Sequence, residues 1–85
     1  MENYLAKMEK KIKLIWDFFG EDALKTAEHH AIHLEEFAKR EKIEQFGCGT
    51  TQQGDLAIAY LIVGEENMIA VRDALRPKRG EWVEV

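Results

Sequence analysis

Cysteine and proline each occur only once in this chain of 85 residues. A single cysteine, Cys48, cannot form an intramolecular disulfide or a thiolate cage around zinc, which excludes a disulfide-stapled scaffold and a structural zinc ribbon. No apolar stretch approaches the roughly 20 residues that a membrane-spanning helix needs, and the N-terminal residues lack the apolar core of a signal peptide. These absences predict a protein of the reducing cytoplasm with no membrane attachment.

The charge balance is acidic, with 16 acidic and 12 basic residues and a formal net charge of −4. Nucleic acids and anionic lipid surfaces both attract proteins with a positive field. The balance therefore disfavours a nucleic-acid binder and a peripheral membrane protein. Hydrophobic residues make up 46% of the chain, which is typical of a folded domain, and the length suits one domain with one core.

Two apolar runs, 12–19 and 56–63, have the length of strands, and each leads into an acidic turn that opens a helical pattern. Weaker strand patterns at 46–52 and 81–85 complete the series strand, helix, strand, strand, helix, strand. The strongest runs are the first and third strands, which are central in a βαββαβ split sheet. We therefore expect an α+β domain over residues 11–85: a four-stranded antiparallel sheet of order 4132 with two helices on one face. Residues 1–10 are expected to form a tail or a short cap.

Apolar residues at helical spacing define one buried side of the first helix, which is expected over about residues 22–42. They are Leu24, Ala27, Ala31, Leu34 and Ala38. The second, shorter helix turns Met68, Val71 and Leu75 inward and ends before Pro77. Glycines at 47 and 49 weaken the second strand, which favours a place at the edge of the sheet.

The third strand is apolar on both of its faces, whereas two helices cover only one face of the sheet. The uncovered face therefore needs another cover. We expect a second copy of the chain to bind there in a homodimer, with the N-terminal segment carrying Tyr4, Leu5 and Met8 as the alternative cover. The expected interface residues are Ile15, Ala57, Ala59, Leu61 and Val63.

Three histidines lie on the first predicted helix, where His29 and His33 share a face at i, i+4 spacing. Glu36 follows one turn later, and two imidazoles with a carboxylate can hold a divalent ion such as Zn²⁺ weakly. The same residues lie opposite the apolar side of the helix, so a solvated helix face is the competing interpretation. No other cofactor is expected.

A few further polar residues are candidates for ligand binding. Asp17 is the one acid inside a strongly apolar strand, and Lys78 and Arg79 place positive charge in the loop after the second helix. Tyr60 on the third strand and His30 on the first helix complete this set. Cys48 has no base at a recognisable spacing, which favours a packed residue over a nucleophile.

The order and relative strength of these elements resemble the ferredoxin-like superfold over residues 11–85. RNA-recognition domains share this order but carry several stacking aromatics in the central strands, where this chain has Tyr60 between alanines. Heavy-metal-associated domains carry a paired-cysteine loop after the first strand, and the corresponding residues 17–20 hold no cysteine. ACT-type regulatory domains are similar in size, charge and element order, although they have no strict motif.

We expect a small cytoplasmic binding or regulatory module that self-associates through the open sheet face and binds a small molecule or a protein partner. One alternative is a small enzyme of the dimeric α+β barrel kind, with His30, Asp17 and Tyr60 in a pocket between helices and sheet. A weak surface metal binder is the other. An enzyme requires polar groups that converge in an apolar pocket, and the spacing of these residues identifies no such convergence, so the enzyme is the less favoured interpretation.

Overall fold

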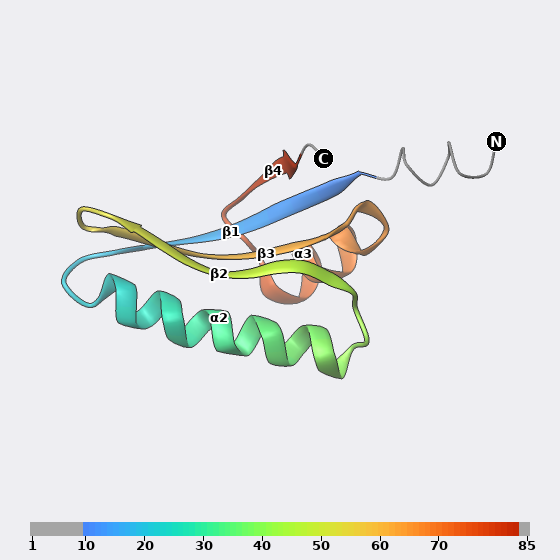
Figure 1. Ribbon diagram of the computed structural model, residues 1–85, viewed down its shortest axis with the longest axis horizontal. Coiled ribbons are helices and arrows are strands. Elements are labelled where there is room, and N and C mark those ends of the chain that lie inside the picture. Colours follow the sequence, from blue (N-terminus) through green and yellow to red (C-terminus); the bar gives the residue numbers. More distant parts are fainter. Residues whose placement is uncertain (1–9, 84–85) are drawn as a thin grey trace.

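The computed structural model describes residues 10–83, which form a single sheet and two α-helices (Figure 1). The elements are β1 (Lys11–Phe19), α2 (Ala23–Arg40), β2 (Gln45–Gln53), β3 (Leu56–Gly64), the 3₁₀ turn η1 (Glu65–Asn67), α3 (Met68–Leu75) and β4 (Arg79–Val83). Tyr4, Leu5 and Met8, the residues of the expected N-terminal cap, lie outside the described residues. No helix in the described part of the chain has both the length and the apolar character needed to cross a membrane.

The four strands lie in the order β2-β3-β1-β4, and each neighbouring pair is antiparallel. This confirms the predicted α+β, βαββαβ arrangement with strand order 4132. The strand with interior glycines, β2, lies at the edge of the sheet as those glycines predict. It joins β3 through a tight turn at residues 54–55, where Gly54 adopts a φ of +60°.

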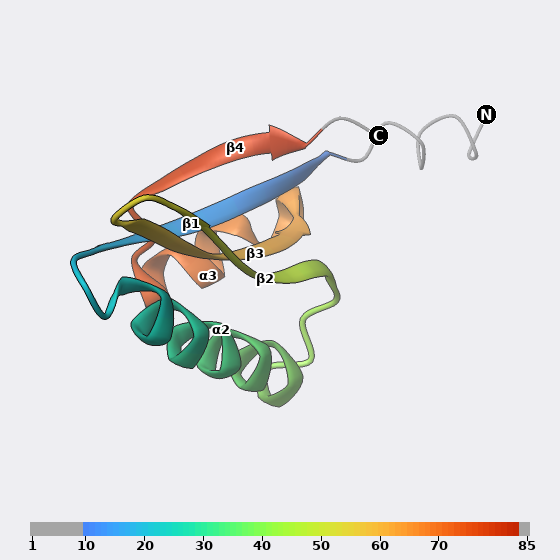
Figure 2. The ribbon, with the colours of Figure 1, turned by 60° about the vertical axis from the view of Figure 1, so that its left-hand side comes forward.

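Both helices cover the same side of the sheet, and no described element covers the other side (Figures 1 and 2). The buried residues of α2 are Ala23, Ala27, Ala31, Leu34 and Ala38. Val71 of α3 belongs to the same core cluster. The indole Nε1 of Trp16 donates a hydrogen bond of 2.8 Å to the carbonyl of Leu75, so the last turn of α3 is held against β1.

The register between the central strands corrects the predicted faces of β3. Trp16 pairs with Ala59, and Leu14 pairs with Leu61. Directly opposed residues of an antiparallel pair point to the same side of the sheet. Because Trp16 and Leu14 pack in the core under the helices, their partners do so too.

The predicted interface set was therefore wrong for four of its five residues. Ala57, Ala59, Leu61 and Val63 are fully buried on the helix side, and only Ile15 lies on the other side, paired with Tyr60. The physical reason is the register of β3 with β1, which turns these four side chains toward the helices. Small residues on both α2 and β3 let the helix approach the strand closely, so these alanines belong to the core.

Candidate functional site

We use the term open face for the side of the sheet that no described element covers. Its β1 and β3 side chains alternate with those that enter the core. They are Lys11, Lys13, Ile15, Asp17 and Phe19 from β1 and Leu56, Ile58, Tyr60 and Ile62 from β3. The outer strand β4 adds Arg79 and Glu81 beside Ile15 and Lys13. Apolar and charged side chains are therefore mixed across this surface.

The centre of the open face is apolar and already shielded. Ile15 is 1% exposed and Ile58 is 9% exposed, although neither belongs to the cluster under the helices. Ile15 is flanked across the strands by Tyr60 on one side and Arg79 on the other. Tyr60 is half-buried, as are Leu56 and Ile62 on the same strand. The apolar area of β3 that a partner could still cover on this face therefore belongs to the half-buried side chains around this centre.

Asp17, predicted as a ligand-binding residue, has a specific partner within the chain. Arg79 donates from Nη2 to Asp17 Oδ1 at 3.1 Å and from Nε to Oδ2 at 3.3 Å. A third bond runs from Arg79 Nη1 to Glu81 Oε2 at 3.2 Å. The hydrogen bond to Asp17 raises the pKa of Arg79, and the charges of Asp17 and Glu81 add to that effect. The structure thus brings two predicted ligand residues together as an ion pair.

Two lysines of β1 lie over aromatic rings. The Lys13 ammonium is 4.6 Å from the centre of the Tyr60 ring, and the Lys11 ammonium is 4.5 Å from that of Phe46. Cation–π contacts of this kind hold the charge near the apolar surface while leaving it in water. Sequence reasoning missed both lysines and Phe46 as parts of this surface, although the alternation of β1 placed Lys13 on the side away from the core.

The glycines of β2 have a packing role that the sequence did not reveal. A Cβ atom at Gly49 would lie 3.1 Å from the Tyr60 hydroxyl, and one at Gly47 would lie 3.0 Å from Ile62 Cδ1. The Tyr60 and Ile62 side chains therefore lie across the edge strand, on backbone that carries no side chain. The two glycines therefore leave room on β2 for the side chains of Tyr60 and Ile62 to lie against the sheet.

His30 lies on the other side of the sheet from Asp17 and Tyr60. Its ring centre is 5.2 Å from that of Trp16 and 5.5 Å from that of Phe18, both on the helix side. Its Nε2 atom is buried and has no hydrogen-bond partner within residues 10–83. Burial lowers the pKa of His30, and the neighbouring His33 lowers it further.

The three polar groups expected to converge in an enzyme pocket therefore do not do so. Asp17 and Tyr60 are on the open face and His30 is under the helices, so this combination is contradicted. Lys78 is an exposed residue whose backbone N–H donates to the Ile15 carbonyl at 2.8 Å. This hydrogen bond holds the backbone of Lys78 against β1, one residue before β4 begins.

The predicted metal ligands are close to one another on an exposed part of α2. The rings of His29 and His33 stack with centres 5.1 Å apart, and His33 Nδ1 lies 3.5 Å from Glu36 Oε1. Within the described residues, no three His, Cys, Asp or Glu side chains are arranged to hold a metal ion. The predicted three-ligand set is thus not assembled, and a two-histidine site stays a prediction.

Cys48 is a packed residue of β2. Its thiol donates to the Ala31 carbonyl of α2 at 3.4 Å. Burial raises the pKa of the Cys48 thiol, and the negative charge of Glu35 adds to the rise. A raised pKa disfavours the thiolate that a nucleophile requires.

Comparisons with known proteins do not assign the chain to a family. No family model matches the chain, and no match was found among curated proteins or among solved structures. The similarity to ACT-type domains thus stays at the level of element order. Functional proposals rest on the surfaces of the chain itself.

Proposed function

We propose that this protein is a small binding or regulatory module that pairs with a second copy of itself through the open face. The observation that carries the proposal is the open face, where Tyr60, Ile62 and Leu56 are half-buried around a buried isoleucine centre. Exposed apolar surface of this kind is stabilised by a partner. A cytoplasmic location is part of the proposal and rests on the single cysteine.

The charges of the open face favour a second copy over a nucleic acid. A two-fold interface brings one patch against itself, so it is stabilised when the patch holds both signs of charge. The patch holds three basic residues, Lys11, Lys13 and Arg79, and two acids, Asp17 and Glu81. Arg79 is already paired with both acids. The net positive field that a phosphate backbone requires is therefore weak here.

The proposal is tested by placing a charge on the open face. Ile62→Glu introduces a carboxylate at a half-buried site of this face, where the two-fold would bring it near its own copy. The control is Ile32→Glu at a residue of α2 that is 56% exposed. Light scattering at tens of micromolar should give the mass of two chains for the wild type and for Ile32→Glu, and of one chain for Ile62→Glu. Circular dichroism should show that all three are folded.

A second variant tests the dimer in case Ile62→Glu does not fold. Phe46→Glu changes a side chain that is 43% exposed at the margin of the open face, so it should weaken the dimer without disturbing the core. A wild-type mass of one chain would overturn the proposal. So would a folded Ile62→Glu protein that keeps the mass of two chains.

A further inference from the structure

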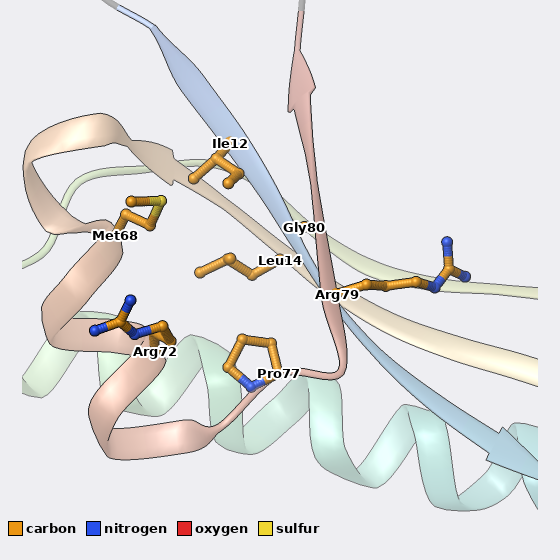
Figure 3. A pocket seen from close by; sticks show the side chains of 7 residues that line it. All are labelled: Ile12, Leu14, Met68, Arg72, Pro77, Arg79 and Gly80. Atoms are coloured by element: carbon orange, nitrogen blue, oxygen red, sulfur yellow. The ribbon is translucent and has the colours of Figure 1, made fainter.

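A groove lies on the helix side of the sheet, between α3 and β4, and Figure 3 shows its lining. Its lining comes from β1, α3, β4 and the loop that joins α3 to β4. The groove has a volume of about 250 Å³, and its walls are Ile12, Leu14, Met68, Pro77, Gly80 and the base of Arg79. We call it the α3–β4 groove. None of the residues predicted from the sequence as ligand-binding places a polar side-chain group in it.

The floor of the groove is apolar and shaped by a glycine. A Cβ atom at Gly80 would lie 3.0 Å from Ile12 Cδ1 and 3.4 Å from Leu14 Cδ2, so the missing side chain leaves this floor open. The Arg79 side chain extends away from the groove (Figure 3), toward its partner Asp17 on the open face. Among residues 10–83, no acid or hydroxyl side chain lines the groove. Its walls therefore suit a hydrocarbon group.

Arg72 of α3 also lines the groove, and its guanidinium lies on the α3 side of it (Figure 3). Its Nε donates to Asp73 at 3.2 Å, while its terminal nitrogens have no hydrogen-bond acceptor among residues 10–83. Arg72 and Pro77 also line an adjoining hollow of about 360 Å³, together with Asp73 and Arg76. Two guanidinium groups and one carboxylate thus border the adjoining hollow. A guanidinium binds a carboxylate with two parallel hydrogen bonds.

We infer that the α3–β4 groove binds a small monocarboxylate with a short hydrocarbon chain. The chain lies on Ile12, Leu14 and Met68, and the carboxylate accepts hydrogen bonds from Arg72. The volume limits the ligand to one smaller than a typical drug. This inference goes beyond the proposed self-association, because the groove and the open face are on opposite sides of the sheet.

The test uses three probes of equal chain length: hexanoate, hexanol and hexylammonium. Binding is followed by NMR through the Met68 methyl and the Gly80 amide, which both line the groove. Hexanoate should shift both signals saturably in the millimolar range, and hexanol and hexylammonium should bind about tenfold more weakly or not at all. Equal binding of the three, or no shift with hexanoate, would overturn the inference.

The charged contact is tested with a matched pair of variants. Arg72→Gln should weaken hexanoate binding about tenfold. Arg40→Gln on α2 should leave it unchanged. The two arginines are comparable, since each is exposed and each bonds through Nε to the acid that follows it, Asp73 or Glu41. Equal affinities for the two variants would contradict the role of Arg72.

The same spectra distinguish other occupants of the groove. Met68 and Gly80 shifts that follow protein concentration and do not respond to hexanoate would assign the groove to a second copy of the chain, and would overturn the inference. The outcome is independent of the dimer test. Ile62→Glu changes only the open face, so it should bind hexanoate as the wild type does.

Discussion

The two faces of the central strands differ in how they are covered. On the helix side, β3 presents Ala57 and Ala59 to the core cluster that α2 completes, and both are fully buried. On the open face, the same strand presents Tyr60 and Ile62, whose neighbours are long charged side chains. The helix side is stabilised by the close packing of α2 against β3. The open face is shielded by side chains that lie over one another. A strand that is apolar on both sides can thus pack against a helix with one face and form part of an accessible surface with the other.

The largest expected effect separates two neighbouring residues on β3. Leu61→Glu places a carboxylate in the fully buried core and should cost more than about 4 kcal/mol, enough to unfold a small domain. Ile62→Glu, on the open face, should cost roughly 1 kcal/mol within one chain, apart from the loss of the proposed pairing. Urea denaturation followed by circular dichroism measures both. Similar losses for the two variants would mean that the two faces are equally enclosed.

An intermediate effect on stability is expected from a larger side chain on the helix side of β3. Ala59→Leu adds volume where α2 packs closely, and should destabilise the protein by about 1–3 kcal/mol through overpacking. Ile58→Leu, on the open face, conserves volume and should cost less than about 1.5 kcal/mol. Thermal unfolding of the pair compares the two faces. A stable Ala59→Leu protein would show that spare volume exists between α2 and β3.

The smallest expected effect concerns pH. The folded pKa of His30 lies below its ordinary value of 6.5, mainly because of burial. The unfolded chain therefore binds a proton more readily than the folded chain as the pH falls below about 6.5, and the stability contributed by neutral His30 is lost in that window. Removing the imidazole with His30→Phe should make the fall in unfolding free energy between about pH 7.5 and 5 shallower.

The control for this pH experiment is His29→Gln, at an exposed position of the same helix. It is expected to keep the slope of the wild type in urea titrations across the same range. If His30→Phe also keeps that slope, the half-buried imidazole of His30 does not account for the dependence of stability on pH.

The sequence predicted the arrangement of elements because periodicity reports burial directly. The alternation of β1 and the helical spacing of Ala27, Ala31 and Leu34 mark the residues that the core encloses. The faces of β3 could not be assigned in that way, since both are apolar. Only the pairing of Trp16 with Ala59 decides between them, and pairing between strands separated by a helix has no local signal.

The candidate surfaces were predicted less well for the same reason. The contact of Asp17 with Arg79 joins residues 62 positions apart, so neither spacing nor composition indicates it. The α3–β4 groove depends on how α3 is placed relative to Gly80 of β4, which the sequence pattern does not indicate. His29 and His33 were predicted together and do lie together, because their proximity follows from the helix alone.

The alanines between α2 and β3 set a limit on how this protein can diverge. Ala27, Ala31, Ala57 and Ala59 belong to one buried cluster, where every residue type except glycine would be larger. Mutational drift at these positions is confined to the smallest side chains, whereas the outward side of α2 is free to change. Remote descendants of the same ancestor would thus keep a pattern of side-chain volume after sequence identity has been lost.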